Sequence, residues 1–189
     1  MNPPKGKRRG GFTVIELILV IVIFMLLASM ALIFNQNEMR SADSQALVDE
    51  IAAWLGEIAM APEDLNTSCT VTFQPGTNLW PTDTIATVEP ASCAKASTLR
   101  VPGNRRQNPY QLGTSQNSWV FNQRGSLSAS STANASSTNT DIIIRVSVAG
   151  QPPLRCVRLS GIMGLVRFGV NSISGSVNGS ATCSNWKRN

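Results

Sequence analysis

Of the side chains that most often carry out chemistry in proteins, this sequence contains some types and lacks others. The chain has no histidine, four cysteines and 11 acidic residues. Without histidine, a Ser-His-Asp triad, a Cys-His pair and most zinc hydrolase sites are excluded. The sequence has no G-x-S-x-G elbow, and residues 161–164 (GIMG) lack the Lys and Ser/Thr that complete a phosphate-binding Walker loop. We therefore expect a protein that is not an enzyme and that uses no cofactor.

The four cysteines could form a metal site or disulfides, and their spacing favours disulfides. Cys69, Cys93, Cys156 and Cys183 include no C-x-x-C pair, which disfavours zinc. An even number of cysteines in an oxidising compartment predicts two disulfides, for which three connectivities exist. Proximity along the chain favours Cys69–Cys93 and Cys156–Cys183. Each would stabilise the fold by about 3–4 kcal/mol in the chain-entropy model.

One carboxylate, Glu16, stands at the start of an otherwise apolar segment. Residues 17–34 contain no charge and no proline, and as a helix they would extend about 27 Å, close to the hydrocarbon thickness of a bilayer. An ionisable group near the centre of a membrane costs at least about 2.5–3.5 kcal/mol, so it usually marks a function and implies a partner. The alternative is that Glu16 lies near the lipid headgroups at modest cost. A basic leader precedes the segment and contains Lys5, Lys7, Arg8 and Arg9.

Residues 11–17 read Gly-Phe-Thr-Val-Ile-Glu-Leu. With the basic leader and the apolar run, they resemble the class III signal of type IV prepilins and type II secretion pseudopilins. The resemblance implies that a prepilin peptidase cuts after Gly11 and N-methylates Phe12. It also implies that Glu16 pairs with the methylated amino terminus of a neighbouring subunit. The implied partners are other pilins or pseudopilins, an assembly ATPase and an inner-membrane assembly platform.

The distribution of positive charge predicts an orientation in the membrane. Basic residues stay on the cytoplasmic side, so the leader is expected in the cytoplasm and the acidic region after residue 34 outside. A secretory signal has an apolar core of about 7–15 residues and is cut after it, whereas here the run is longer and the cut lies before it. We expect a single-pass protein of the bacterial inner membrane with a periplasmic head, which then enters a pilus or pseudopilus.

The periodicity of apolar residues predicts a long helix with two different halves. We expect a cleaved leader at residues 1–11, a transmembrane half of the stem helix at 12–34 and an amphipathic half at 35–61. Many major pilins carry a helix-bending proline in the apolar half, but no proline occurs here between Pro4 and Pro62. We expect Pro62 to end the helix. In the amphipathic half, apolar residues recur at steps of three and four, at Leu47, Ile51, Trp54, Leu55 and Ile58.

Residues 62–189 are expected to form a β-rich head, because short β-like runs alternate there with Gly, Pro, Ser and Asn. Residues 126–140, rich in Ser, Thr, Ala and Asn, are expected to be an exposed, mobile loop. The predicted fold class is α+β, a long N-terminal helix packed on an antiparallel β-sheet head, as in pilins. We expect strands at residues 70–73, 84–88, 98–101, 118–122, 141–148, 154–159 and 164–170.

Charge is divided unevenly along the chain. Residues 35–94 carry one Arg and nine acids, whereas residues 95–189 carry eleven Lys and Arg and a single acid, Asp141. This asymmetry fits an anionic partner for the C-terminal half, or electrostatic matching between neighbouring subunits. Charges on strands can also simply face water. The candidate DNA or anion contacts are Arg105, Arg106, Arg158, Arg167, Lys187 and Arg188; the wider basic set adds Arg100, Arg124, Arg145 and Arg155, with Tyr110, Trp119 and Trp186 as candidate stacking residues.

A second, shorter resemblance lies in the head. Residues 121–125 (FNQRG), 157–160 (VRLS) and 164–167 (GLVR) are similar to the strand end and C-terminal hairpin of GspH/FimT-type pseudopilins and minor pilins. In FimT-like competence pilins, that hairpin bears a Gly-Arg-x-Arg motif that contacts DNA. Gly164 and Arg167 match the motif, whereas Leu165 replaces its first arginine. Half of the DNA-binding motif is therefore present.

These features predict a non-catalytic structural subunit, a minor pilin of a type IV pilus or a pseudopilin of a type II secretion system. The alternative is a minor pilin that binds DNA for uptake in natural transformation. A third possibility is a membrane-tethered periplasmic module that joins no filament and stays unprocessed.

Overall fold

The computed structural model describes residues 13–103, 108–123, 126–129, 141–161, 165–178 and 182–188, without the side chains of residues 30–35, 129 and 188. The chain divides into two compact units, one up to Met39 and one from Arg40 onward. We call the second unit the head. Leader residues 1–11 lie outside the described residues.

Helix α1 covers Val14–Leu65 and belongs to both units. The prediction that Pro62 ends the helix is wrong, because α1 continues to Leu65. Pro62 lies in the last turn and is buried, so its ring disturbs the contact with one preceding carbonyl only, while its packing is retained. The helix ends where Asn66 adopts a left-handed φ of 50° and its carbonyl accepts a hydrogen bond from Gln123.

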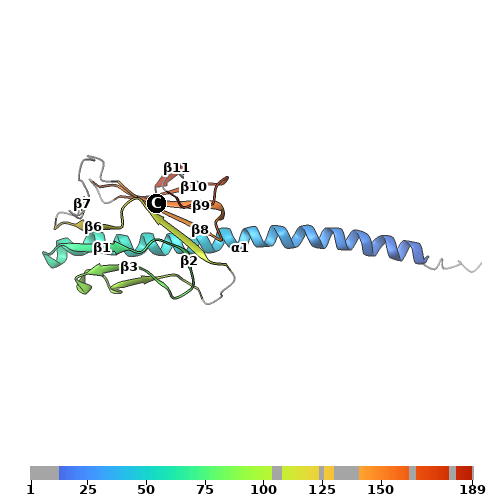
Figure 1. The fold of residues 1–189 in the computed structure, drawn as a ribbon, viewed down its shortest axis with the longest axis horizontal. Helices are drawn as coiled ribbons and strands as arrows, with labels where there is room; N and C mark the ends of the chain where they lie inside the picture. The colour runs from blue at the N-terminus through green and yellow to red at the C-terminus, as the bar shows by residue number, and fades with distance from the viewer. Residues whose placement is uncertain are drawn as a thin grey trace, which may run out of the picture. The chain divides into compact units, whose positions relative to one another are not determined.

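In the described part of the head, the strands build two antiparallel sheets (Figure 1), one of five strands and one of six. Sheet A has the order β4-β3-β1-β6-β7 and sheet B the order β11-β10-β9-β8-β5-β2. The strands of sheet A are β1 (Cys69–Phe73), β3 (Thr84–Glu89), β4 (Thr98–Arg100), β6 (Ser118–Phe121) and β7 (Leu127–Ala129). Those of sheet B are β2 (Gly76–Leu79), β5 (Tyr110–Thr114), β8 (Ile142–Val148), β9 (Gln151–Leu159), β10 (Val166–Asn171) and β11 (Ser184–Arg188).

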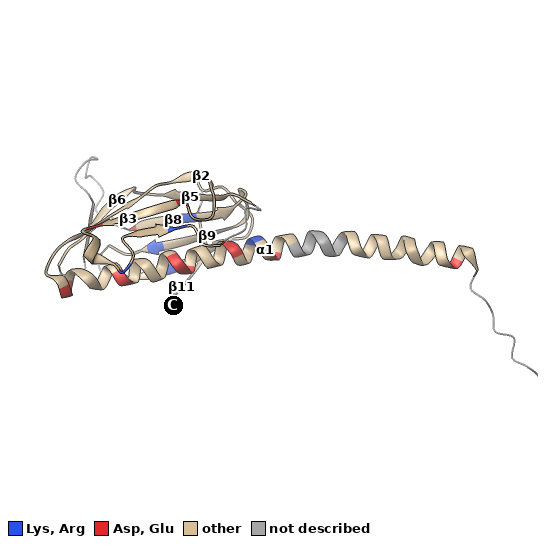
Figure 2. Cartoon of the chain, turned by 90° about the horizontal axis from the view of Figure 1, so that it is seen from below, with Lys and Arg blue, Asp and Glu red and all other residues tan. Residues whose placement is uncertain are grey.

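One hydrophobic core joins the head half of α1 to both sheets. The apolar stripe predicted from periodicity is confirmed: Trp54 is 6% exposed, and Leu47, Ile51, Leu55 and Ile58 are fully buried. They share a core with residues of sheet A and of sheet B, and the two sheets cover one side of the helix (Figures 1 and 2). The predicted fold class, a long helix packed on antiparallel β-structure, is therefore confirmed.

Aromatic side chains fix the helix against sheet A. The indole N–H of Trp54 donates a hydrogen bond of 2.8 Å to the carbonyl of Ala96. Its ring meets Phe73 edge-on, and Phe73 stacks on Trp119 with 5.3 Å between ring centroids. Trp119 is fully buried, so the alternative that it belongs to the core is correct and it offers no stacking surface to DNA.

The predicted strands are present with small shifts at their ends, but four observed strands were missed: β2, β5, β7 and β11. One of these corrects the predicted loop at residues 126–140, because β7 pairs with β6 there and Leu127 is buried. A single apolar residue in a Ser-rich run was too weak a signal for a strand. Residues 130–140 of that predicted loop lie outside the described residues.

Two disulfides cross-link the head, with the pairing that chain proximity favours. Cys69 at the start of β1 is joined to Cys93, which ends the short 3-10 helix η1 (Ala91–Cys93). Cys156 of β9 is joined to Cys183, just before β11. Gly169 of β10 lies between these elements, and a Cβ atom there would come within 2.9 Å of the Trp186 ring and 3.1 Å of the Cys183 Cβ. The Cys156–Cys183 disulfide therefore crosses β10 at Gly169, which has no side chain in its way.

Candidate functional site

The first candidate site is at the start of α1, where Thr13 and Glu16 cap the helix. The Glu16 carboxylate accepts hydrogen bonds from the backbone N–H of Thr13 at 2.9 Å and from its hydroxyl at 3.0 Å. The backbone N–H of Glu16 donates to the Thr13 hydroxyl at 3.4 Å. This reciprocal pattern is a capping box, which satisfies amide groups that a helix otherwise leaves unpaired.

The capping box holds the Glu16 carboxylate on the backbone N–H of Thr13, the first described residue. A negative charge at a helix N-terminus is favoured by the helix dipole, so Glu16 suits this end of α1. Sequence reasoning identified Glu16 but missed Thr13, although Thr-x-x-Glu before an apolar run is a recognisable capping signal. Gly11 and Phe12 themselves lie outside the described residues.

The rest of this helical unit presents apolar side chains to its surroundings. Between Val14 and Leu27 the large aliphatic and aromatic side chains are 41–75% exposed. Exposed apolar surface of this extent marks a region that contacts other proteins or lipid. Among the described residues, no helical segment meets the length and hydropathy of a membrane span.

The second candidate site is a row of arginine positions across sheet B. In the antiparallel register Arg158 of β9 lies opposite Arg167 of β10, which lies opposite Arg188 of β11. We call these three positions the arginine row. Directly opposed positions share one face of a sheet. The row therefore collects three of the predicted anion contacts, although the Arg188 side chain lies outside the described part.

An acidic residue and an aromatic ring already engage one member of the row. Both Nε and Nη2 of Arg158 donate to Oδ2 of Asp141, with an Nε–Oδ2 distance of 2.9 Å. The Arg158 guanidinium also lies 5.8 Å from the centroid of the Trp186 ring. The hydrogen bonds from Arg158 lower the pKa of Asp141, which also accepts one from the amide of Gly161. Sequence reasoning missed this role of Asp141, since 17 residues separate it from Arg158.

The predicted contact Lys187 does not join the row. It lies opposite Phe168, one position along from the pair of Arg167 and Arg188, and alternation places it on the other face of the sheet. There it lines an open cavity of about 680 Å³, together with Gln45 and Asp49 of α1 and with Arg155. The predicted contacts Arg105 and Arg106 lie outside the described residues.

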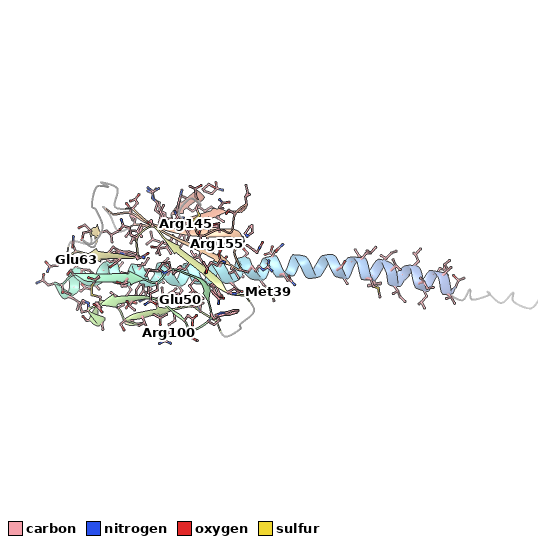
Figure 3. The ribbon with its side chains drawn as sticks, in the orientation of Figure 1. Met39, Glu50, Glu63, Arg100, Arg145 and Arg155 are labelled. Atoms are coloured by element: carbon pink, nitrogen blue, oxygen red, sulfur yellow. A yellow bond between two sulfur atoms is a disulfide. The ribbon has the colours of Figure 1, made fainter. Side chains whose placement is uncertain are left out.

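Two further arginines of the basic set have structural positions inside the head (Figure 3). Arg155 donates hydrogen bonds of 3.1 Å to the hydroxyls of Ser44 and Ser41, and thus ties β9 to α1. Arg145 is 6% exposed, and burial lowers its pKa. Of the wider basic set, Arg145 is therefore not available as a phosphate contact, because a buried guanidinium does not reach a polyanion.

Comparison with known proteins agrees with the N-terminal site. The family model described as the Prokaryotic N-terminal methylation motif matches residues 6–32. No curated protein and no solved structure was found to be similar to the chain. The matched segment contains the capping box and most of the apolar run, and it leads into a helix that packs on antiparallel sheets. The chain therefore carries a prepilin-type N-terminal methylation motif on a pilin-like α+β fold.

Proposed function

We propose that this protein is a non-catalytic structural subunit, a minor pilin or pseudopilin with a GspH/FimT-type head. It would serve a type IV pilus or a type II secretion pseudopilus. The observation that carries the proposal is the methylation motif at residues 6–32 on a pilin-like helix and head. A prepilin peptidase removes residues 1–11 and methylates Phe12, after which the subunit waits in the bacterial inner membrane with its head in the periplasm.

The exposed apolar unit supports assembly through the helix. Residues 13–29 and 36–39, whose side chains are described, bury little of their own apolar surface. They therefore need lipid before assembly and the helices of other pilins or pseudopilins afterwards. An inner-membrane assembly platform and its ATPase move the subunit from one environment to the other. In sequence the apolar run extends to residue 34, and the side chains of residues 30–35 lie outside the described part.

The capping box supports a specific role for Glu16. Its carboxylate is satisfied within the chain by Thr13, which lowers the cost of holding a charge at the edge of a membrane. After cleavage the methylated amino group of a neighbouring subunit competes for the same oxygen atoms. Thr13 then acts as a positioning residue that keeps Glu16 oriented until that partner arrives.

Processing in cells tests the proposal directly. Coexpression of the full chain with a prepilin peptidase should shorten it by the leader, and mass spectrometry should find N-methylphenylalanine at the new terminus. Gly11→Val should prevent the shift in mobility, whereas Gly10→Ala serves as the matched control and should still be cut. A wild-type chain that keeps its full length in the presence of an active peptidase would contradict the proposed function.

A second candidate function is DNA binding by the head during natural transformation, and the arginine row favours it. Arg158 and Arg167 lie opposite each other on sheet B, and position 188 follows in the same register; phosphate contacts by arginine side chains weaken steeply with salt. Duplex DNA titrated with the full chain in detergent, from low to high salt, tests this function. R167Q should reduce the affinity and flatten the salt dependence, whereas R100Q on sheet A is the matched control.

A further inference from the structure

The link between α1 and β1 carries a short motif that the proposed function does not use. Residues 66–68 (NTS) follow the last residue of α1 and end just before β1. They match Asn-x-Ser/Thr, the acceptor sequence for N-linked oligosaccharides on surface segments of exported proteins. The sequence contains two further matches, which begin at Asn134 and Asn178. Because so short a motif recurs by chance, the structural setting of each triplet decides between them.

The first triplet is open to solvent. The side chains of Asn66 and Ser68 are exposed, and Thr67 between them is half-buried. The carbonyl oxygen of Asn66 accepts a hydrogen bond from Gln123, whereas the side-chain amide of Asn66 forms none within the described part of the chain. No hydrogen bond in this part of the chain therefore has to break before a sugar is attached to the amide nitrogen.

The disulfides of the head indicate the compartment in which it folds. Cys69–Cys93 and Cys156–Cys183 are typical of oxidising compartments outside the cytoplasm. The triplet at Asn66 belongs to the same unit of the chain as both bonds. It therefore lies in an exported part of the protein, as an N-linked oligosaccharide requires.

An open polar cavity lies beside the triplet. Gln123, which contacts the carbonyl of Asn66, lines a cavity of about 460 Å³ together with Ser68, Asn122 and Ser126. All four lining side chains end in hydroxyl or amide groups, which both donate and accept hydrogen bonds and so suit the hydroxyls of a sugar. A sugar attached to Asn66 thus has space and polar partners next to it.

Two exposed acids, Glu63 and Asp64, precede the triplet in the last turn of α1 (Figure 3, where Glu63 is labelled). The helix dipole places partial negative charge at a C-terminus, so acids are unfavourable there. No basic residue lies in this turn, and neither acid forms an ion pair within the described part of the chain. The stability of the helix therefore does not explain the two acids.

Recognition of the link by an enzyme would explain one of these acids. Helix ends fray readily, and in an extended segment residues two apart point to the same side. When the link is drawn out along an enzyme, Asp64, Asn66 and Ser68 share one side and Glu63 lies on the other. Asp64 would then present its charge beside the acceptor, where a basic groove can attract it.

The triplet at Asn178 lacks this setting. Val177, just before it, is buried, and its carbonyl oxygen occupies the space that a side chain at Gly113 of β5 would need. Two positions before Asn178 stands Ser176, which carries no charge. This triplet therefore continues from a segment packed on sheet B and has no acid at the matching position. Asn134 lies outside the described residues.

We propose that Asn66 is the attachment site of an N-linked oligosaccharide. The amide nitrogen of Asn66 forms a bond to the anomeric carbon of the first sugar, and the bond from that carbon to the pyrophosphate of a lipid-linked donor breaks. The amide loses one proton to the transferase, and the pyrophospholipid leaves with the bonding electrons. Asp64 supplies the charge that the transferase recognises. The proposal goes beyond the filament function and requires only that the head is exported.

Coexpression tests the attachment site. The full chain is produced in bacteria with an N-oligosaccharyltransferase and its lipid-linked oligosaccharide, extracted in detergent, and measured by intact-mass and glycopeptide mass spectrometry. A known acceptor protein in the same cells reports that the transferase is active. We expect the mass of one oligosaccharide on Asn66 and none on Asn178. A chain that stays unmodified beside a modified acceptor protein, or that is modified at Asn178 alone, would overturn the proposal.

Variants separate attachment at Asn66 from the structural role of this residue in ending α1. Glycine readily adopts the left-handed φ of 50° found there, so N66G keeps the helix end and should lose the oligosaccharide. S68T keeps the hydroxyl of the triplet and should still be modified, whereas S68A should not be. N178Q is the matched control and should keep the full mass increase. A full mass increase in N66G would refute attachment at this site.

The two acids provide a graded measurement. D64N should lower the modified fraction about fivefold, because the transferase loses one charge-assisted contact. E63Q removes an equal charge from the other side of the extended link and should be modified like the wild type. A modified fraction in D64N equal to that of E63Q would refute the role of Asp64.

The outcomes are separate from those for the filament function. A chain that keeps its leader in the presence of the peptidase, yet carries the oligosaccharide on Asn66, would lose the filament function and retain the attachment site. A chain that is cut but stays unmodified beside a modified acceptor protein would do the reverse.

Discussion

The two units of this chain use their apolar residues in opposite ways. In the head, the apolar stripe of α1 is buried and shares a core with two sheets. In residues 13–29 and 36–39, whose side chains the structure describes, side chains of the same types are exposed. Hydrophobic burial is the main source of folding stability, so the head contains its own stabilising contacts. Under the proposed function, the first unit obtains such contacts from lipid and from other subunits, so its exposed residues hold the assembly and the buried residues of the head hold the fold.

The largest expected effect is on assembly, and it comes from the unit without a core. Removing one partner of an ion pair leaves the other charge unpaired. Glu16→Ala should therefore lower incorporation into sheared filaments by about a hundredfold, because the amino terminus of the neighbouring subunit loses its carboxylate. Cleavage after Gly11 and the melting temperature of the head should not change. Glu38→Ala, an exposed acid in the same unit, is the matched control, and equal losses in both variants would break the comparison.

The head should show the reverse behaviour when its core is altered. Leu55 is fully buried in the core, and Leu→Ala changes at such sites cost about 2–5 kcal/mol because a cavity remains. Chemical denaturation of the full chain in detergent, followed by tryptophan fluorescence, should show this loss for Leu55→Ala. Met60→Ala on the same helix is the control, since Met60 is 72% exposed. A loss of stability at Met60 that matches the loss at Leu55 would mean that the exposed side of α1 is also packed.

The two disulfides sharpen the comparison, since both lie in the head. Replacing Cys156 and Cys183 together by serine should destabilise the head by about 3 kcal/mol, because a closed loop of this length restricts the unfolded chain. Denaturation with and without a reducing agent measures the effect. Reduction should lower the denaturation midpoint of the wild type more than that of the double variant, because the double variant has already lost one of the two disulfides. An unchanged denaturation midpoint in the double variant would show that β11 is held by its ladder and by Trp186 alone.

The smallest expected effect concerns acid pH and the Asp141–Arg158 pair. The hydrogen bonds from Arg158 hold the folded pKa of Asp141 below its usual value of about 3.8. The unfolded state therefore binds the proton first as pH falls, and the stabilisation present above about pH 4 is lost as the pH falls through the folded pKa. Because Arg158 is 36% exposed, this contribution should not exceed about 1 kcal/mol.

Urea denaturation midpoints measured between pH 5 and pH 2.5 give the slope of stability against pH, to which Asp141 contributes. Asp141→Asn should remove that part of the slope, and Asp83→Asn, just before β3 of the other sheet, is the matched control. If both variants keep the full slope, the ion pair does not couple the head to pH.

Local patterns predicted the helix stripe, both disulfide pairs and the fold class. Leu47, Ile51, Leu55 and Ile58 recur at helical intervals, and each pair of cysteines is close along the chain. Other features depend on register, which local patterns do not encode. Arg158 and Arg167 become neighbours only through the pairing of β9 with β10, and Lys187 turns to the other face because of its position opposite Phe168. Asn66, whose left-handed backbone ends α1, was missed as the helix end because proline is the stronger helix-ending signal in the sequence and Pro62 comes first.

The continuity of α1 through both units has a mechanical consequence. A pulling force applied to residues 14–39 reaches the head through the backbone of one helix. The core side chains of α1, from Leu47 to Ile58, are locked between neighbours over about three turns. Tension along the helix axis would load these contacts together in shear rather than one after another, and the bonds from Arg155 to Ser41 and Ser44 would share the load. The head should therefore resist extraction forces along the helix better than forces that peel its edge strands.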